Sequence, residues 1–188
     1  MNNIAVTGSY ASGKSFVLEC AQSMGYKIFS CDNYVRELYQ DINLQKFVES
    51  KIEKLGKFNK KRLARIIYSD SDSRKKLESI IHPKVRGGIK SFEQQNAGEK
   101  IIFTEVPLLF ESGFDKYFLY TLCVFCSEDT RIARAKSRGN INSEFFEKIK
   151  KIQLSQEEKK VRANFTIDSE KDVNQIKIVL TEIIDSIK

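Results

Sequence analysis

Apolar runs of a few residues alternate along this chain with longer stretches of helical spacing. The short runs predict buried strands at Ile4–Thr7, Lys27–Ser30, Lys100–Glu105, Tyr117–Cys126 and Asn164–Asp168. Apolar residues three and four positions apart, with charges between them, predict helices at Lys14–Met24, Thr130–Ser137, Ser143–Gln153 and Asp172–Ile187. Strands that alternate with helices favour an α/β fold, in which a parallel sheet is covered by helices on both faces.

The stretch from Val35 to Gly98 interrupts this alternation. It carries helical patterns and no convincing strand, so it predicts a helical insertion between the second and third strands. In an enzyme of this architecture, such an insertion can form the acceptor side of the cleft. The chain has 188 residues, no internal repeat and only two prolines, and its length suits one domain with small insertions.

The four cysteines lie in apolar or motif-bearing segments, and no signal peptide precedes them, which favours a reducing cytoplasm. Cys123 and Cys126 have the spacing of a redox or metal pair, but residues three apart on a strand point to opposite faces. No second cysteine pair accompanies them, and the single histidine is far away in the sequence. Zinc and redox chemistry are therefore disfavoured.

Hydropathy and charge narrow the choice of partners only in part. No apolar run approaches the length of a membrane span, so we expect a soluble protein with no membrane partner. The net charge of +7 suits nucleic acid, an anionic surface or phosphorylated small molecules, and a solvated basic surface is the ordinary explanation. Charge alone does not choose among these.

The first predicted strand runs into a glycine-bearing loop that matches the pattern G-x-x-x-x-G-K-[ST] at every fixed position, from Gly8 to Ser15. The glycines let backbone amides turn inward around phosphate oxygens, and the following helix offers its positive N-terminal end to the same anion. Lys14 would neutralise the β- and γ-phosphates, and the Ser15 hydroxyl would hold magnesium. The alternative is an ordinary glycine turn before a helix. The predicted nucleotide-binding residues are Gly8, Ala11, Ser12, Gly13, Lys14, Ser15 and Phe16.

The remaining motifs separate classes of phosphate-loop protein. A guanine-specific GTPase needs an Asn-Lys-x-Asp tetrad to recognise the base. The nearest match, Asn59-Lys60-Lys61-Arg62, ends in arginine, which disfavours a GTPase. A small-molecule kinase needs an acidic group near the acceptor hydroxyl and arginines that close over the transferring phosphoryl group.

Two acidic residues follow predicted strands. Asp32 comes after the second strand, and the carboxyl edge of a parallel sheet is where α/β folds bind ligands. Asp32 can therefore be a catalytic base, or equally an N-cap of the helix Asn33–Tyr39. Glu105 closes the third strand, where it could orient magnesium through water or serve no role.

Three arginines follow the fourth strand at helical spacing. Arg131, Arg134 and Arg138 would share one helix face, because steps of three and four residues bring side chains together. Clustered like charges destabilise a helix unless an anion binds there. A solvated basic face is the alternative explanation.

The whole-chain pattern resembles the dephospho-CoA kinase family. The resemblance is carried in family order by Thr7 to Ser15, Cys31-Asp32 with Arg36, Ile81-His82-Pro83, Val106-Pro-Leu-Leu-Phe-Glu111, Arg134 with Arg138, and Gln153 to Ala163. These blocks span nearly the entire chain. The phosphate loop alone would indicate only a superfamily. The Pro-Leu-Leu-Phe-Glu block and the block from Gln153 to Ala163 narrow the resemblance to this one family.

The resemblance implies transfer of the ATP γ-phosphoryl group to the ribose 3′-hydroxyl of dephospho-CoA, the last step of coenzyme A synthesis. It implies five parallel strands, a nucleotide-binding core at residues 1–34, 99–130 and 160–188, a helical CoA-side insertion at 35–98, and a lid with following helices at 131–159. Asp32 would serve the acceptor hydroxyl, Arg138 the transferring phosphoryl group and Arg134 the nucleotide. Arg36 and His82 match positions on the acceptor side, although a histidine before proline is as often structural.

Four positions depart from the family pattern. Ser30 replaces the first aspartate of an Asp-Ala-Asp triplet, and Phe16 replaces the threonine after Lys-Ser. Asn164 and Ser169 stand where aspartate and asparagine are common. Ser30 removes one carboxylate from the cleft and places more weight on Asp32, and Ser169 is expected to alter contacts near the adenine.

Two other functions fit part of the pattern. Another phosphate-loop kinase, acting on a nucleoside or a nucleoside monophosphate, would be built from the same parts. A basic nucleic-acid-binding protein regulated by ATP is the second alternative. Against it, aromatic residues do not interleave with a basic stripe, so we expect no nucleic-acid partner.

Overall fold

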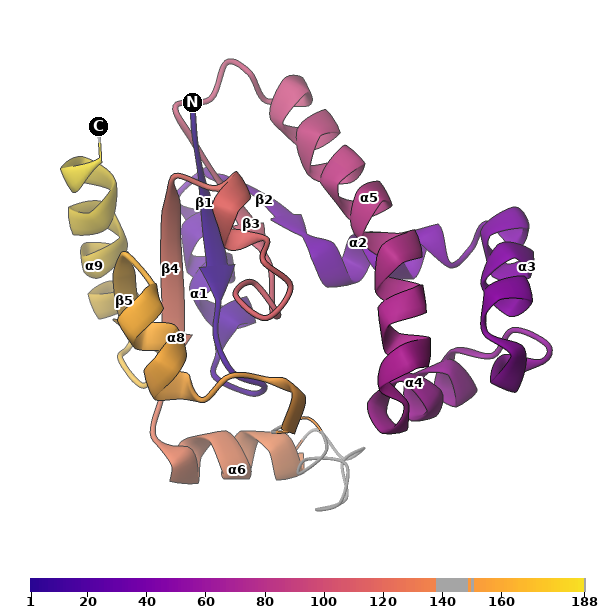
Figure 1. Ribbon diagram of the computed structural model, residues 1–188. Coiled ribbons are helices and arrows are strands. Elements are labelled where there is room, and N and C mark those ends of the chain that lie inside the picture. Colours follow the sequence, from indigo (N-terminus) through magenta and orange to yellow (C-terminus); the bar gives the residue numbers. More distant parts are fainter. Residues whose placement is uncertain (138–148, 150, 188) are drawn as a thin grey trace. The chain divides into compact units, whose positions relative to one another are not determined.

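The computed structural model of the chain describes residues 1–137, 149 and 151–187. Internal contacts divide the chain into two units (Figure 1). Unit 1 comprises Met1–Ser30 and Glu93–Lys188, and unit 2 comprises Cys31–Phe92. The helices described include none that is long and apolar enough to cross a membrane.

Unit 1 is built on a parallel sheet of five strands with the order β2-β3-β1-β4-β5. The strands are β1 (Asn2–Thr7), β2 (Lys27–Ser30), β3 (Ile101–Glu105), β4 (Tyr120–Phe125) and β5 (Phe165–Asp168). The predicted α/β fold and its five strands are confirmed. Several predicted strand ends were wrong by one or two residues, and the largest difference is at β4, which begins at Tyr120 and not at Tyr117 because Asp115–Tyr117 form a short 3₁₀ helix, η2, before it.

Helices cover both faces of this sheet. On one face, α1 (Lys14–Ser23) and α9 (Val173–Ser186) contact each other and share an apolar core with the strands, to which β4 contributes Leu122 and Val124. Cys123 lies between these two residues and therefore points to the other face. Burial raises the pKa of the Cys123 thiol to about 11, and the nearby charge of Lys159 opposes this shift. Lys159 belongs to α8 (Gln156–Arg162), which packs on that second face.

The helix α6 (Glu128–Ser137) follows β4, and its start is capped by a residue distant in sequence. Glu170, in the turn after β5, accepts hydrogen bonds from the backbone N–H and hydroxyl of Ser127 at 3.0 and 2.7 Å, and from the Thr130 hydroxyl. These bonds hold the pKa of Glu170 below its ordinary value. The predicted helix Ser143–Gln153 lies largely outside the described residues.

Every regular element described in unit 2 is a helix. The unit contains α2 (Cys31–Leu38), α3 (Ile42–Lys51), the 3₁₀ helix η1 (Glu53–Leu55), α4 (Lys60–Ser69) and most of α5 (Ser71–Gln95). Side-chain caps from Asp41 and Asn59 begin α3 and α4. Within the unit, α2 packs closely on α5, because a Cβ atom at Gly88 would lie 2.5 Å from the ring of Tyr34.

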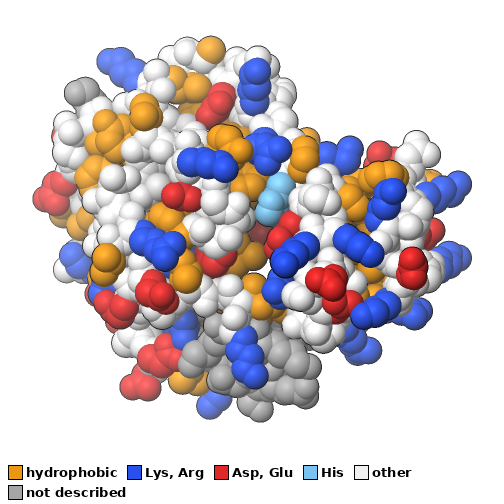
Figure 2. All heavy atoms as spheres, in the orientation of Figure 1, with side chains coloured by type: hydrophobic (Ala, Val, Ile, Leu, Met, Phe, Trp, Pro, Cys, Tyr) orange, Lys and Arg blue, Asp and Glu red, His pale blue; other side chains and the backbone are white. Residues whose placement is uncertain are grey.

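The two units differ in charge. Unit 2 contains 15 Lys and Arg against 8 Asp and Glu, an excess of 7 that equals the net charge of the whole chain. Lys and Arg side chains are spread over the helices of unit 2 in Figure 2. The segments that form unit 1 are therefore neutral overall, with 17 residues of each sign.

Candidate active site

The predicted phosphate loop connects β1 to α1. β1 ends at Thr7, and α1 begins at Lys14, with Gly13 as its N-cap residue. The loop therefore lies at the carboxyl edge of the central strand and leads into a helix N-terminus. That end of a helix carries free N–H groups and a positive partial charge, which together attract an anion.

Two loop positions require glycine. Gly8 has φ +152°, and a Cβ atom there would lie 2.3 Å from the carbonyl oxygen of Val124 in β4. Gly13 has φ +91°, and its Cβ would lie 2.5 Å from Oγ of Ser169. Between them, Ala11 adopts φ 63°, a left-handed conformation that costs an L-residue about 1–2 kcal/mol. The backbone is thus forced into a tight concave turn, the geometry that directs successive amides toward an anion.

Side chains of the loop are arranged around this turn. The Lys14 ammonium donates to the carbonyl oxygens of Gly8 and Ser9, each at 3.0 Å, so it lies across the loop. The hydroxyls of Ser9 and Ser12 are buried, at 1% and 0% residue exposure, and neither finds a hydrogen-bond partner among the described residues. A buried polar cradle with a lysine over it fits a polyphosphate chain.

A second polar group lies at the same sheet edge. Glu105, the last residue of β3, pairs in register with Val6 of β1 and with Ser30 of β2. The Ser30 hydroxyl donates to Oε2 of Glu105 at 2.8 Å. The serine that departs from the family pattern thus holds the carboxylate, which lies beside the strand that feeds the phosphate loop.

The C-terminal half of the loop is held by Ser169, after β5. Its hydroxyl donates to the carbonyl oxygen of Ser12 at 2.6 Å, and Arg134 of α6 donates to the Ser169 hydroxyl at 2.8 Å and its carbonyl oxygen at 3.0 Å. Arg131 instead forms an ion pair with Glu128 at 2.6 Å. The two arginines therefore have different partners. Arg138 lies outside the described residues.

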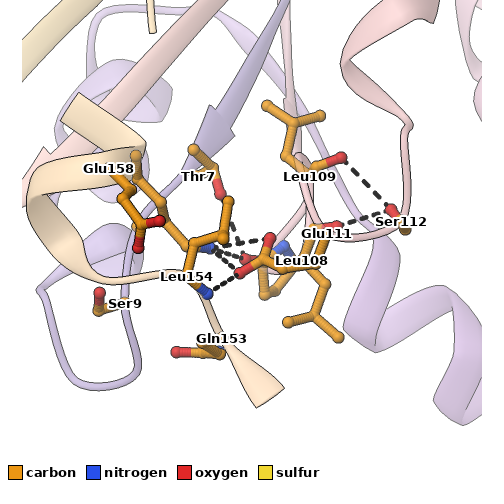
Figure 3. A network of polar contacts seen from close by, with 12 residues as sticks. Thr7, Ser9, Leu108, Leu109, Glu111, Ser112, Gln153, Leu154 and Glu158 are labelled. Carbon is orange, nitrogen blue, oxygen red and sulfur yellow. Dashed lines mark hydrogen bonds and ion pairs between the residues drawn. The ribbon is translucent and has the colours of Figure 1, made fainter. Parts of the chain in front are cut away.

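The N-terminal half of the loop contacts the two blocks that narrowed the resemblance. Tyr10 donates its backbone N–H to Oε1 of Gln153 at 2.9 Å, and the Thr7 hydroxyl donates to the carbonyl oxygen of Pro107 at 3.2 Å. An ion pair between Glu111 and Lys159, at 2.9 Å, joins these blocks to each other. Figure 3 shows Glu111 with Thr7, Gln153 and Leu154. The sequence alone assigned no individual role to four of these residues: Pro107, Glu111, Gln153 and Lys159. The only sequence signal for them was that their two blocks occur together with the phosphate loop.

The remaining departures from the family pattern have structural contacts. Asn164 accepts hydrogen bonds through Oδ1 from the backbone N–H and hydroxyl of Thr121, at 2.8 and 2.9 Å, which joins β5 to β4. The Phe16 side chain packs against the core of α1 and α9.

The predicted acceptor-side residues belong to unit 2. Asp32 and Arg36 lie on α2, in its first and last turns. The alternative that Asp32 is the N-cap was wrong, because the helix begins one residue earlier, at Cys31. A carboxylate in the first turn is still favoured by the helix dipole. His82 lies inside α5, directly before Pro83, and burial lowers the pKa of its imidazole.

The donor set suits magnesium. The Ser15 hydroxyl lies in the first turn of α1, and the Glu105 carboxylate ends β3, so both oxygen donors follow strands that lie next to each other. Among the described residues, no three His, Cys, Asp or Glu side chains form a metal cluster. Magnesium at kinase sites is commonly held by one or two protein oxygens with substrate phosphates and water, and these residues fit that pattern.

Comparisons with known proteins give a consistent result. The model of the dephospho-CoA kinase family matches residues 2–175. A dephospho-CoA kinase from Rickettsia typhi is 38% identical over 185 residues, which cover 98% of this chain and 97% of the relative.

Two solved structures resemble the whole chain. Protein TT1252 from Thermus thermophilus has a TM-score of 0.84 at 26% identity, covering 100% of this chain and 98% of that one. A dephospho-CoA kinase from Campylobacter jejuni has a TM-score of 0.66 at 27% identity, covering 99% and 96%.

Proposed function

Because the chain belongs to the dephospho-CoA kinase family, we propose that it transfers the γ-phosphoryl group of ATP to the ribose 3′-hydroxyl of dephospho-CoA. The products are CoA and ADP, and the reaction is the final step of coenzyme A biosynthesis. The observation that carries the proposal is the complete phosphate loop at the carboxyl edge of β1, beside the Ser30–Glu105 pair.

The phosphate loop binds the ATP polyphosphate. Amides of the Gly8–Gly13 turn and the N-terminus of α1 provide donors, and the Lys14 ammonium moves from the loop carbonyls to the β- and γ-phosphates. Bound magnesium neutralises charge on these phosphates. The Ser15 hydroxyl would be its direct ligand, and Glu105 would orient one of its water ligands.

The acceptor is bound on the side of unit 2. In the reaction, the ribose 3′-oxygen forms a bond to the γ-phosphorus while the bond to the β–γ bridging oxygen breaks, and the electron pair leaves with ADP. Asp32 orients the 3′-hydroxyl and accepts its proton. Arg36 and His82 would contact the acceptor, and the positive excess of unit 2 suits a substrate that carries a pyrophosphate.

Arginines complete the proposed site. Arg138 stabilises the charge on the transferring phosphoryl group, and Arg134 serves the nucleotide from its position beside Ser169. In this assignment residues 35–98 form the CoA side, residues 131–159 form the lid, and the remaining segments form the nucleotide core. We also propose a reducing, cytoplasmic setting, which suits four buried thiols.

Substrate profiling tests the function. The purified protein, with ATP and magnesium, is offered dephospho-CoA, nucleosides and nucleoside monophosphates separately, and ADP release is recorded for each. We expect dephospho-CoA to be preferred by at least about a hundredfold in kcat/KM, the discrimination that paired polar contacts provide. Preference for a nucleoside or nucleoside monophosphate would overturn the substrate assignment. Strong, salt-dependent binding of random oligonucleotides without kinase activity would favour the nucleic-acid alternative.

A further inference from the structure

Two hydrogen bonds hold the N-terminal half of the phosphate loop from outside. One joins the Thr7 hydroxyl to the carbonyl oxygen of Pro107 at 3.2 Å, directly before Gly8. The other joins the Tyr10 backbone N–H to Oε1 of Gln153 at 2.9 Å, directly before the strained residue Ala11. They therefore restrain the chain on both sides of the turn that leaves β1.

Both acceptors are tied to a single ion pair. The Lys159 ammonium donates to the carbonyl oxygen of Pro107 at 2.7 Å and lies 2.9 Å from Oε1 of Glu111. The same Glu111 oxygen accepts the backbone N–H of Leu154 at 2.8 Å, next in sequence to Gln153. Figure 3 shows the Glu111 carboxylate beside Leu154, with Gln153 next to Leu154 in the same segment.

The pair is almost entirely removed from water. The Lys159 side chain is 0% exposed and the Glu111 side chain 11%. Burying two charges carries a desolvation penalty that their attraction commonly fails to repay, so apolar residues of similar volume would serve packing alone as well or better. What apolar residues could not do is hold the Pro107 carbonyl and the Leu154 amide in place.

We propose that Glu111 and Lys159 are positioning residues for ATP binding. They act through Pro107 and Gln153 to hold Thr7 and Tyr10, and so keep the loop in the turn that binds phosphate. Without these restraints, the left-handed Ala11 could relax, and part of the binding energy of ATP would be used to restore the turn. The inference rests on the proposed ATP site.

Substitution of two glutamines tests the hydrogen bond between Gln153 and the Tyr10 backbone. Gln156 lies three residues after Gln153 and also bonds the main chain, but its two hydrogen bonds go to the N–H and carbonyl oxygen of Cys126. We expect Gln153→Ala to raise the Kd of ATP and KM for ATP about three- to tenfold, the effect of one lost hydrogen bond, with KM for dephospho-CoA unchanged. Gln156→Ala should leave the Kd of ATP and KM for ATP unchanged. Equal ATP constants in the two variants would overturn the proposal.

A double-mutant cycle tests whether the ion pair and Gln153 act on the same turn. Lys159→Met should weaken ATP binding, and the loss of affinity in the double variant with Gln153→Ala should be smaller than the product of the two single losses, because both changes loosen the one turn that contains Ala11. Multiplicative effects would contradict the proposal. If Lys159→Met does not fold, the cycle is run with Lys159→Met combined with Glu111→Gln, which leaves no unpaired buried charge.

Lys14→Ala separates failure of this inference from failure of the ATP site. If Lys14→Ala loses ATP binding while Gln153→Ala and the ion-pair variants do not, only the positioning role is refuted. If Lys14→Ala also binds ATP normally, the phosphate loop is not the ATP site and both proposals fall.

Discussion

The two units present their chemistry in different ways. Unit 1 is neutral overall, yet it contains the phosphate loop, whose shape depends on the main-chain conformation at Gly8, Ala11 and Gly13. Unit 2 carries the whole positive excess of the chain on a set of helices. An anion site built from main-chain amides therefore needs little net charge, whereas a charged surface suits a long, flexible anionic substrate.

The largest expected effect lies in unit 1. Lys14→Ala should lower phosphoryl transfer about a hundredfold or more, because the ammonium would neutralise charge that develops on the transferring group. The fold should persist, since the Lys14 side chain bonds loop carbonyls and is not part of the apolar core. Steady-state kinetics and thermal unfolding check the two halves of this prediction. Unchanged turnover in a folded variant would refute the phosphate-loop assignment.

A comparable effect is expected in unit 2. Asp32→Asn should lower turnover of dephospho-CoA by roughly a hundredfold, because asparagine cannot accept a proton at neutral pH. ATP affinity and thermal stability should stay close to those of the native protein. A smaller loss would indicate that Asp32 orients the hydroxyl more than it removes the proton, since a loose transition state needs little deprotonation. Full activity would remove Asp32 from the mechanism.

A smaller effect is expected from a substitution that lowers the stability of unit 2 alone. Gly88→Ala would push a methyl group into the ring of Tyr34, so we expect unit 2 to lose about 1–3 kcal/mol of unfolding free energy. KM for dephospho-CoA should rise and KM for ATP should not, because the change acts on α2, which carries Asp32. Gly87→Ala is the matched control, because a Cβ atom at Gly87 would have nothing within 4 Å beyond its own turn of the helix, and alanine should stabilise the helix by about 0.5–1 kcal/mol. Denaturant unfolding that ranks the two variants otherwise would refute the packing argument.

Salt should affect the two substrates unequally. Raising the salt concentration from about 0.05 to 0.5 M shortens the Debye length several-fold and should raise KM for dephospho-CoA about threefold or more. KM for ATP should change less, because its phosphates are proposed to bind main-chain amides at short range. Kinetics at constant free magnesium check this. An equal salt response of both constants would show that the positive excess of unit 2 does not attract the acceptor.

The smallest predicted effect concerns His82, the only histidine of the chain. Burial, opposed by Glu78 and supported by Arg86, lowers the pKa of its imidazole below the ordinary value of about 6.5. The unfolded chain then binds the proton more readily, so this contribution to stability is complete above pH 6.5 and is lost as pH falls through the folded pKa. Between pH 7.5 and 5, the free energy of unfolding should fall less in His82→Gln than in the native protein. Identical pH profiles of the two proteins would contradict the lowered pKa of His82.

Much of the fold was predictable because its signals are local. Short apolar runs located all five strands, and three- and four-residue spacing located α1, α6 and α9, since each pattern depends on which faces of one element are buried. The start of β4 was missed because Tyr117 has the composition of a strand while its backbone forms a 3₁₀ turn with Asp115. The N-cap interpretation of Asp32 failed for a similar reason, since helix ends depend on bonds that the pattern does not encode.

The candidate site was predictable only where backbone geometry demands a residue type. Gly8 and Gly13 are required by positive φ and close contacts, so the loop can be recognised from sequence alone. The partners of the loop are another matter. Three of them form hydrogen bonds with residues 143, 157 and 100 positions away in the sequence: Gln153, Ser169 and Pro107. A contact over such a separation leaves no local pattern in the sequence.

Local patterns were enough to predict the succession of strands and helices along the chain, the phosphate loop and the resemblance to one kinase family, because periodicity and fixed spacing act within a few residues. What holds the phosphate loop depends on tertiary packing. Packing of α8 on β4 buries Lys159 against Glu111, and the register of β2 with β3 joins Ser30 to Glu105. Such contacts arise when distant segments share one buried volume, where leaving a polar group without a hydrogen bond costs free energy.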